Sequence, residues 1–220
     1  MDKHQCDLVC FGFNLVNESH VVHHVRKFRK EKCISSQLAQ KKLLRGEISP
    51  DVWNKAFKKS LYENLYYPNG MICETVLISA EFFHRAKKIM LSPAVTYNYI
   101  FPREGSICYQ AQKGTNLSKI TKDCISLTRK RKRFISRYYP KLSLLAKRQF
   151  VKLRIGLLIR KLNVDTSSYG LSEKHCHSFF KKNFIGLFMG FKFSIKQSTR
   201  ILFYLFSPKL GKKCINSSLP

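Results

Sequence analysis

A nearly continuous apolar run, rich in valine and phenylalanine, extends from Leu8 to Val16. A strand that alternates apolar and polar residues buries one face, whereas an uninterrupted apolar strand is buried on both faces, as in the sheets of α/β proteins. Segments with helical spacing follow this run. We therefore predict an α/β domain in which this strand is buried within the sheet.

Patterns of helical and strand spacing continue through the first half of the chain. Residues 17–34 are polar and basic, which favours an excursion or a hairpin after the first strand. Helical spacing predicts three helices, at residues 35–45, where Gly46 is a stop signal, and at 51–61 and 74–88, where the spaced residues are apolar. A proline and an Asn-Gly pair predict a loop at residues 66–70, and alternation predicts a strand at residues 95–99 that a turn at 102–107 follows.

Basic residues dominate the second half of the chain. The whole sequence has 41 lysines and arginines against 13 acidic residues, a net charge of +28. Residues 1–115 contain 17 basic and 10 acidic side chains, whereas residues 116–220 contain 24 and 3. Because so little negative charge balances the second half, we expect it to bind an anionic surface. The hydrophobic content of 44% is enough for a folded core, which argues against a disordered chain.

Two features of this half predict contact with an anionic membrane. Residues 179–204, taken as a helix, place lysines and an arginine within an arc of about 100° and place phenylalanine, leucine and isoleucine opposite them. No uninterrupted apolar run is long enough to span a bilayer, so we expect such a helix to lie in the membrane interface. The predicted membrane-binding residues are the block Arg129, Lys130, Arg131, Lys132 and Arg133 and, on the helix, Lys181, Lys182, Lys192, Lys196 and Arg200.

Eight cysteines are distributed along the chain without a Cys-x-x-Cys pair. No charged and then apolar signal segment opens the sequence, which favours free thiols in a reducing cytoplasm. The segment His175-Cys176-His177 and the histidines of residues 20–24 lack a second cluster at metal-ligand spacing. We expect them to be surface polar residues and not metal ligands.

An ordered series of motifs spans the first half: DLVCFGF at residues 7–13, VWNK at 52–55, a loop that ends at Glu74, YNY at 97–99 and REGS at 103–106. In this order the motifs resemble the acceptor-side half of family 2 glycosyltransferases, the GT-A type enzymes of bacterial lipopolysaccharide, capsule and surface polysaccharide biosynthesis. The resemblance implies an incomplete, Rossmann-like GT-A domain at residues 1–110 that lacks the nucleotide-binding half. Residues 111–220 are then expected to form a basic, mostly helical region that is peripheral to the membrane.

The resemblance also implies roles for individual residues. It implies four substrate-binding residues, Trp53, Asn54, Lys55 and Arg103. The family supplies its catalytic base as the second residue of a Glu-Asp pair, but here that position is Thr75, which cannot act as a base at neutral pH. Glu74 is therefore the remaining candidate. The residues alone also allow Trp53 to be a core side chain, the two cations to be solvated, and the tyrosines of the YNY motif to be packing residues.

The implied reaction transfers a sugar from a nucleotide-sugar to a surface glycan or a lipid-linked acceptor at the inner face of the cytoplasmic membrane. The family neutralises the leaving diphosphate with Mg²⁺ or Mn²⁺ held by an Asp-x-Asp motif, which this sequence lacks. We therefore expect no metal site, no cofactor and no turnover by this chain alone. Two alternatives stay open: a catalytically inactive membrane-associated remnant, and a nucleic-acid-binding protein, which the pI near 10.0 favours.

Overall fold

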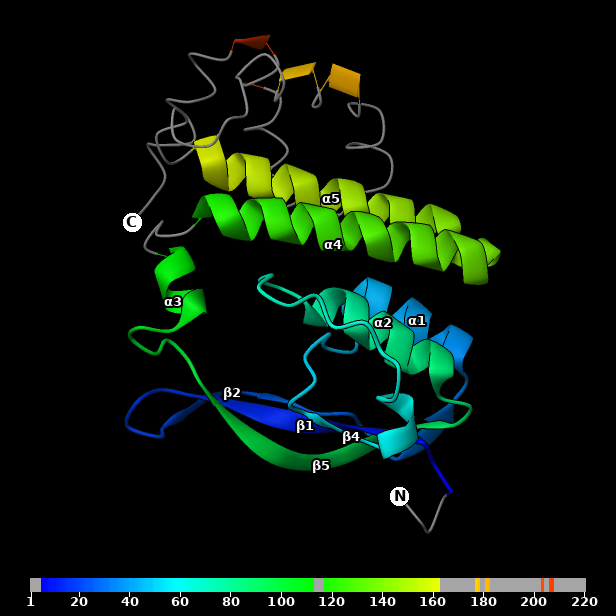
Figure 1. The fold of residues 1–220 in the computed structure, drawn as a ribbon. Helices are drawn as coiled ribbons and strands as arrows, with labels where there is room; N and C mark the ends of the chain where they lie inside the picture. Colours follow the sequence, from blue (N-terminus) through cyan, green and yellow to red (C-terminus); the bar gives the residue numbers. More distant parts are fainter. Residues whose placement is uncertain are drawn as a thin grey trace. The chain divides into compact units, whose positions relative to one another are not determined.

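The computed structural model describes residues 5–112 and 117–162, together with positions 177–178, 181–182, 203 and 206–207. The chain divides into two compact units, Met1–Ala146 and Lys147–Pro220. The first unit contains a mixed sheet with helices on one face, so the chain has the α/β character that the sequence predicts (Figure 1). The amphipathic helix predicted at residues 179–204 lies almost wholly outside the described residues.

Strands of the first unit form one sheet. Its described members are β1 (Leu8–Val16), β2 (Val22–Arg26), β3 (Lys32–Ile34), β4 (Lys55–Phe57) and β5 (Ile89–Ile100). The order across the sheet is β2-β1-β5-β3, and β4 pairs with the edge of β1 that β2 also uses. Strands β1 and β5 are parallel, whereas the other pairs are antiparallel. Most of β1 is buried, and β2 follows it as a hairpin. The predicted buried strand and the predicted hairpin after it are therefore confirmed.

The register between β1 and β5 shifts on both sides of Gly12. Before the shift Cys10 lies opposite Leu91, and after it Phe13 lies opposite Tyr97. A Cβ atom on Gly12 would lie 2.7 Å from a backbone oxygen of β2, so a larger residue would force the hairpin apart. The shift therefore brings aromatic side chains together where the two parallel strands end.

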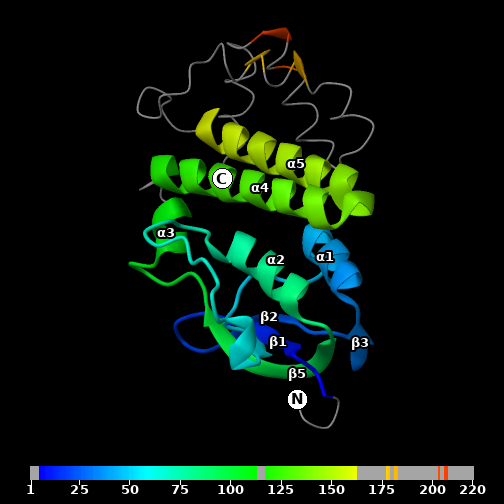
Figure 2. The same ribbon diagram turned by 45° about the vertical axis from the view of Figure 1, so that its right-hand side comes forward.

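Two helices, α1 (Ser36–Arg45) and α2 (Thr75–Arg85), cover one face of the sheet (Figures 1 and 2). Helix α1 begins after Ser35, whose hydroxyl accepts the backbone N–H of Leu38, and ends at Gly46, which adopts a left-handed φ of 74°. Buried apolar side chains of both helices pack against β1 and β5, and burial of each contributes about 2 kcal/mol. The main core includes Leu8, Leu43, Ile78, Phe82, Phe83, Ile89 and Leu91.

Further helices follow β5 in the chain: α3 (Ile107–Gln112), α4 (Leu117–Tyr138) and α5 (Ser143–Leu162), with the short 3₁₀ helix η3 (Pro140–Leu142) before α5. Helix α4 packs against α2 on the side that faces away from the sheet (Figure 2). One face of α4 is buried, and Ile135 on this face packs with Leu44 of α1. Among the described residues, no helix combines the length and the apolar composition that a membrane span requires.

The helix predicted at residues 51–61 is wrong. The chain turns at Val52, whose carbonyl accepts the backbone N–H of Lys55, and then forms β4 and the 3₁₀ helix η2 (Lys59–Leu61). The apolar spacing at Trp53 and Phe57 suits a strand as well as a helix, because residues two apart also share a strand face. Pairing with the free edge of β1 satisfies the backbone of this segment, and this long-range contact decides between the two patterns.

Candidate functional site

Parallel strands β1 and β5 end at one edge of the sheet, and α2 begins on the same side (Figure 1). Sheets of the α/β type bind ligands beyond the carboxyl ends of parallel strands. The turn before β4 brings Trp53 to this edge, followed by Asn54 and Lys55, and Arg103 follows β5. Three of the four predicted substrate residues are therefore adjacent in one turn, and the fourth reaches the same edge from a separate segment.

Trp53 lies at the centre of an aromatic cluster. Its ring stacks on Tyr97, with centroids 4.5 Å apart, and on Tyr99, at 5.1 Å with an interplanar angle of 6°. The ring of Phe13 meets it edge to face at 4.9 Å. The Tyr97 side chain is 40% exposed, so solvent reaches this cluster. We name Phe13, Trp53, Tyr97 and Tyr99 the aromatic cluster.

The turn that carries Trp53 is held by one buried ammonium group. Lys55 Nζ donates to the carbonyl of Ser49 at 2.8 Å, to the carbonyl of Asp51, and to the side-chain oxygen of Asn54 at 2.9 Å. The Asn54 amide nitrogen donates to the Phe11 carbonyl at 3.1 Å, which fixes the turn to β1. Asn54 is 3% exposed and Lys55 is 9% exposed, so both side chains bind the turn itself. Their predicted role in substrate binding stays a prediction.

Burial changes the acidity of two side chains at this edge. It lowers the pKa of Lys55 to about 8, although the charges of Cys10 and Asp51 act in the opposite direction. It also raises the pKa of Tyr99 to about 12, and the hydrogen bond to Cys108 and the charge of Asp51 add to this increase. Asp51 thus connects the turn and β5 electrostatically, although no sequence pattern selects it as a site residue.

Arg103 is exposed, and its positive charge acts to lower the pKa of Tyr99. This influence places the guanidinium within electrostatic range of the aromatic cluster. Gly105, close behind it, adopts a left-handed φ of 75° in the turn that the sequence predicts before α3. Arg103 is consequently the one predicted substrate residue at this edge whose side chain is exposed.

Glu74 directly precedes α2, where the helix dipole favours a negative charge. The Tyr67 hydroxyl forms a side-chain hydrogen bond with its carboxylate, and burial, followed by the Glu74 charge, raises the pKa of Tyr67. Thr75 is the first residue of the helix. The predicted base is therefore paired with a side chain of the loop that precedes it.

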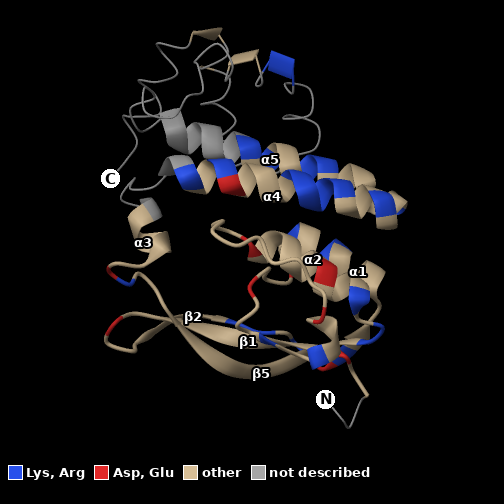
Figure 3. Ribbon diagram, viewed as in Figure 1, with Lys and Arg blue, Asp and Glu red and all other residues tan. Residues whose placement is uncertain are grey.

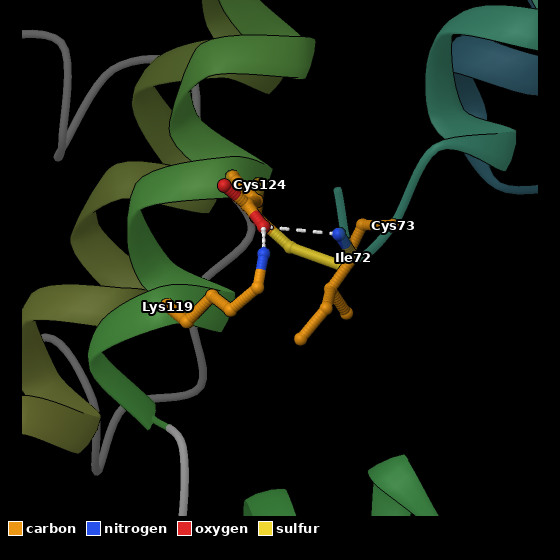
Figure 4. Close-up of a disulfide and its surroundings, with 5 residues drawn as sticks. Ile72, Cys73, Lys119 and Cys124 are labelled. Carbon is orange, nitrogen blue, oxygen red and sulfur yellow. Dashed lines mark hydrogen bonds and ion pairs between the residues drawn. A yellow bond between two sulfur atoms is a disulfide. The ribbon is translucent and has the colours of Figure 1, made fainter. Parts of the chain in front are cut away.

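The loop before Glu74 is fastened to α4 by a disulfide between Cys73 and Cys124 (Figure 4). This bond contradicts the prediction that the cysteines are free thiols. Next to it, Asp123 accepts the backbone N–H of Ile72 at 3.0 Å and the Lys119 ammonium at 2.8 Å. The two cysteines are 51 residues apart in sequence, so spacing alone could not pair them. Cys6, Cys10, Cys33 and Cys108 are thiols.

The basic block lies on α4 (Figure 3), and its members differ in exposure. Arg129, Lys130 and Arg133 are exposed, whereas Arg131 and Lys132 are half-buried. Burial lowers the pKa of Arg131 to about 10, as expected for a guanidinium on the buried face of the helix. At 100° per residue, the exposed members share an arc of about 100° with two further exposed cations. We name Lys122, Arg129, Lys130, Arg133 and Arg137 the α4 basic face.

No protein-family model matches this chain, and a search of curated proteins found no significant match. Within the part of the chain that the structure describes, no three His, Cys, Asp or Glu side chains are grouped so as to hold a metal ion. A function for this chain therefore has to be inferred from the chemistry of the residues at the sheet edge.

Proposed function

We propose that the first unit is the acceptor-side half of a GT-A type, family 2-like glycosyltransferase domain, and that its aromatic cluster binds a sugar ring of a glycan acceptor. The observation that carries this proposal is the stacking of Trp53 on Tyr97 and Tyr99 at the carboxyl ends of two parallel strands. Aromatic rings with polar tips offer a sugar both an apolar surface and hydrogen-bonding groups. Three side chains of this kind meet at an edge where α/β sheets bind ligands.

The arrangement around the cluster supports the same proposal. The buried network of Lys55 fixes the turn, so Trp53 is held in place before a ligand arrives. Arg103 supplies an exposed cation next to the cluster, which suits an acidic sugar or a phosphate of a lipid-linked acceptor. An aromatic surface beside one exposed cation is a binding arrangement, and it needs no catalytic group.

Sugar transfer itself requires groups that the described residues do not bring together. The divalent cation of the family does not fit here, because the Asp7 carboxylate already accepts the Lys58 ammonium at 2.8 Å and the backbone N–H groups of Lys87 and Lys88. Asp7 also precedes β1, at the opposite end of the strand from the cluster. Thr75 stands where the family has its catalytic base, and a hydroxyl group cannot act as a base at neutral pH. We therefore propose acceptor binding without turnover by this chain alone.

Saturation-transfer NMR with oligosaccharides from bacterial surface glycans tests this proposal. We expect sugar-ring protons to receive saturation from the wild-type protein and a much weaker transfer with Tyr97→Ala. Val21→Ala, a change at an exposed residue in the loop before β2, serves as a control and should leave the signal unchanged. Nucleotide-sugar turnover by the isolated chain would contradict the second part of the proposal, and absent transfer from every glycan would contradict the first.

We also propose that the α4 basic face binds an anionic membrane surface, because five exposed cations share one side of this helix. Each cation near such a surface contributes about 1 kcal/mol. The predicted peripheral location at the inner face of the cytoplasmic membrane rests on this binding. Flotation with anionic liposomes tests it, and a gel shift of short DNA at physiological salt tests the nucleic-acid alternative. A protein that shifts DNA but does not float with liposomes would contradict the membrane proposal.

A further inference from the structure

Two thiols that lie far apart in the sequence face each other at the start of the sheet. Cys6 lies two residues before β1, and Cys33 lies in β3, yet their sulfur atoms are 3.9 Å apart. Met90 in β5 connects them, because it pairs with Cys33 in the sheet and packs with Cys6 in a small apolar cluster. The fold therefore brings the two sulfur atoms together across three segments of the first unit.

The two thiols differ sharply in access to solvent. Cys33 is exposed on the edge strand β3, whereas Cys6 is 0% exposed. Burial raises the pKa of Cys6, and the hydrogen bond with Cys33 adds to this, while the charge of Lys88 acts in the opposite direction. An exposed thiol next to a buried one is the arrangement in which the first reacts with a reagent from solution and the second resolves the product.

We propose that Cys6 and Cys33 form a thiol–disulfide exchange site that takes low-molecular-weight disulfides, with Cys33 as the attacking residue and Cys6 as the resolving residue. The Cys33 thiolate attacks one sulfur of the small disulfide, whose S–S bond breaks and releases one small thiolate. Cys6 then attacks the Cys33 sulfur, and its proton passes to the second small thiolate as that group leaves. The protein loses two electrons, and the small disulfide gains them and leaves as two thiols.

This site is separate from the disulfide between Cys73 and Cys124, which joins the Glu74 loop to α4. Closing the Cys6–Cys33 bond would connect the start of β1 to the edge strand β3 across β5. Strand β3 is only three residues long, its first two residues are exposed, and the strand that it pairs with is β5. We therefore expect oxidation to raise the Tm of the first unit relative to the dithiol form.

Peptide mapping under non-reducing conditions tests the proposal on the full-length chain. The wild-type protein is incubated with glutathione disulfide at pH 8, quenched in acid, alkylated and digested. We expect a peptide pair joined through Cys6 and Cys33. Exposed Cys108, whose sulfur contacts the Tyr99 hydroxyl, is the internal control and should carry glutathione as a mixed disulfide.

Two variants separate the roles of the sulfur atoms. Cys6→Ser should accumulate glutathione on Cys33, because no resolving thiol remains, and Cys33→Ser should leave Cys6 unmodified, because that thiol is buried. Circular dichroism checks that each variant is folded, and the wild-type map decides the question if Cys6→Ser is not. Glutathione on both Cys33 and Cys108 of the wild-type protein, without a Cys6–Cys33 bond, would overturn the proposal. Equal modification of Cys6 in the wild-type protein and Cys33→Ser would overturn the assigned order of attack.

Discussion

The rings of Trp53 and Tyr99 lie parallel to within 6°, with their centroids 5.1 Å apart, although 46 positions separate them in the sequence. Trp53 comes from the turn before β4, and Tyr99 comes from the end of β5. Their contact exists only when β4 and β5 have both paired with β1. The aromatic cluster therefore forms only in the assembled sheet, and its presence indicates that the sheet has formed.

Truncation of Trp53 should destabilise the first unit. Trp53→Ala removes stacking on two tyrosines and the edge contact with Phe13, and we expect the free energy of unfolding to fall by about 3 kcal/mol. Urea denaturation followed by circular dichroism measures this change. Leu144→Ala, at a side chain that is 60% exposed, should change the free energy by less than about 0.5 kcal/mol. Equal effects of the two substitutions would contradict the packing of Trp53.

The lowered pKa of Lys55 predicts a specific dependence of stability on pH. Between pH 8 and 10.5 the unfolded chain keeps the Lys55 proton, whereas the folded chain has released it, so this residue makes stability rise with pH across that window. Lys55→Met lacks this contribution. The free energy of unfolding of the wild type should therefore increase relative to Lys55→Met, by at most about 3 kcal/mol, as pH rises through the window.

Denaturation of both proteins at closely spaced pH values checks this expectation. The raised pKa of Cys10 acts in the opposite direction above pH 9, and Lys55→Met also changes that pKa because the Lys55 charge lowers it, so the rise between pH 8 and 9 is the part that reports on Lys55 alone. A difference that stays constant between pH 8 and 10.5 would show that Lys55 has an ordinary pKa.

Removal of the Cys73–Cys124 disulfide should weaken the link between the Glu74 loop and α4. The bond closes a loop of 51 residues, for which the lost chain entropy corresponds to about 4 kcal/mol. We expect Cys73→Ser/Cys124→Ser to lose up to this amount in urea denaturation. Reduction of the wild type with dithiothreitol should give a similar loss, and the double variant should not respond to the reductant. A wild type that is equally stable with and without reductant would contradict the disulfide.

Arg85 should hold the loop after η2 in place. Its guanidinium donates to the carbonyls of Leu61 at 3.3 Å, Glu63 at 2.5 Å and Asn64 at 3.1 Å. We expect Arg85→Met to reduce the free energy of unfolding by about 2 kcal/mol and to speed hydrogen exchange at residues 61–65. Arg103→Met, at an exposed side chain, is the matched control and should leave exchange in that loop unchanged.

Reversal of charge on the α4 basic face should weaken binding to anionic liposomes. The triple variant Arg129→Glu/Lys130→Glu/Arg133→Glu should bind on the order of 100-fold more weakly, since each cation contributes about 1 kcal/mol. The matched control reverses three exposed cations elsewhere, Lys27, Arg29 and Lys30. Equal loss in both variants would indicate that net charge, and not the α4 basic face, determines the binding.

Local signals in the sequence predict much of the first unit. The apolar run of β1, the helical spacing at residues 35–45 and the alternation before Tyr99 each predict an element that the structure contains. The helix predicted through Trp53 is wrong, because pairing with β1 outweighs local spacing. Contacts between segments distant in sequence, such as the Cys73–Cys124 bond, cannot be predicted from the residue spacing of one sequence.

The candidate site was predictable only in part for the same reason. The resemblance selected Trp53 and Arg103, but it gave no ground for joining them with Tyr97 and Tyr99, which were expected to be packing residues only. The register shift at Gly12 places Phe13 of β1 opposite Tyr97 of β5. At Gly12 the backbones of β1 and β2 also approach closely, which the spacing of residues in the sequence does not predict. Asp51 was missed because its influence on Tyr99 appears only after folding.

The central claim is that the aromatic cluster binds a glycan, and Trp53 offers a direct measurement because it is the only tryptophan in the sequence. Its fluorescence emission should change saturably when oligosaccharides from bacterial surface glycans are added to the wild type, and Tyr97→Ala should weaken this response at least about tenfold, which corresponds to 1.4 kcal/mol. Emission that stays constant with every glycan, from a protein that is folded by circular dichroism, would contradict the claim.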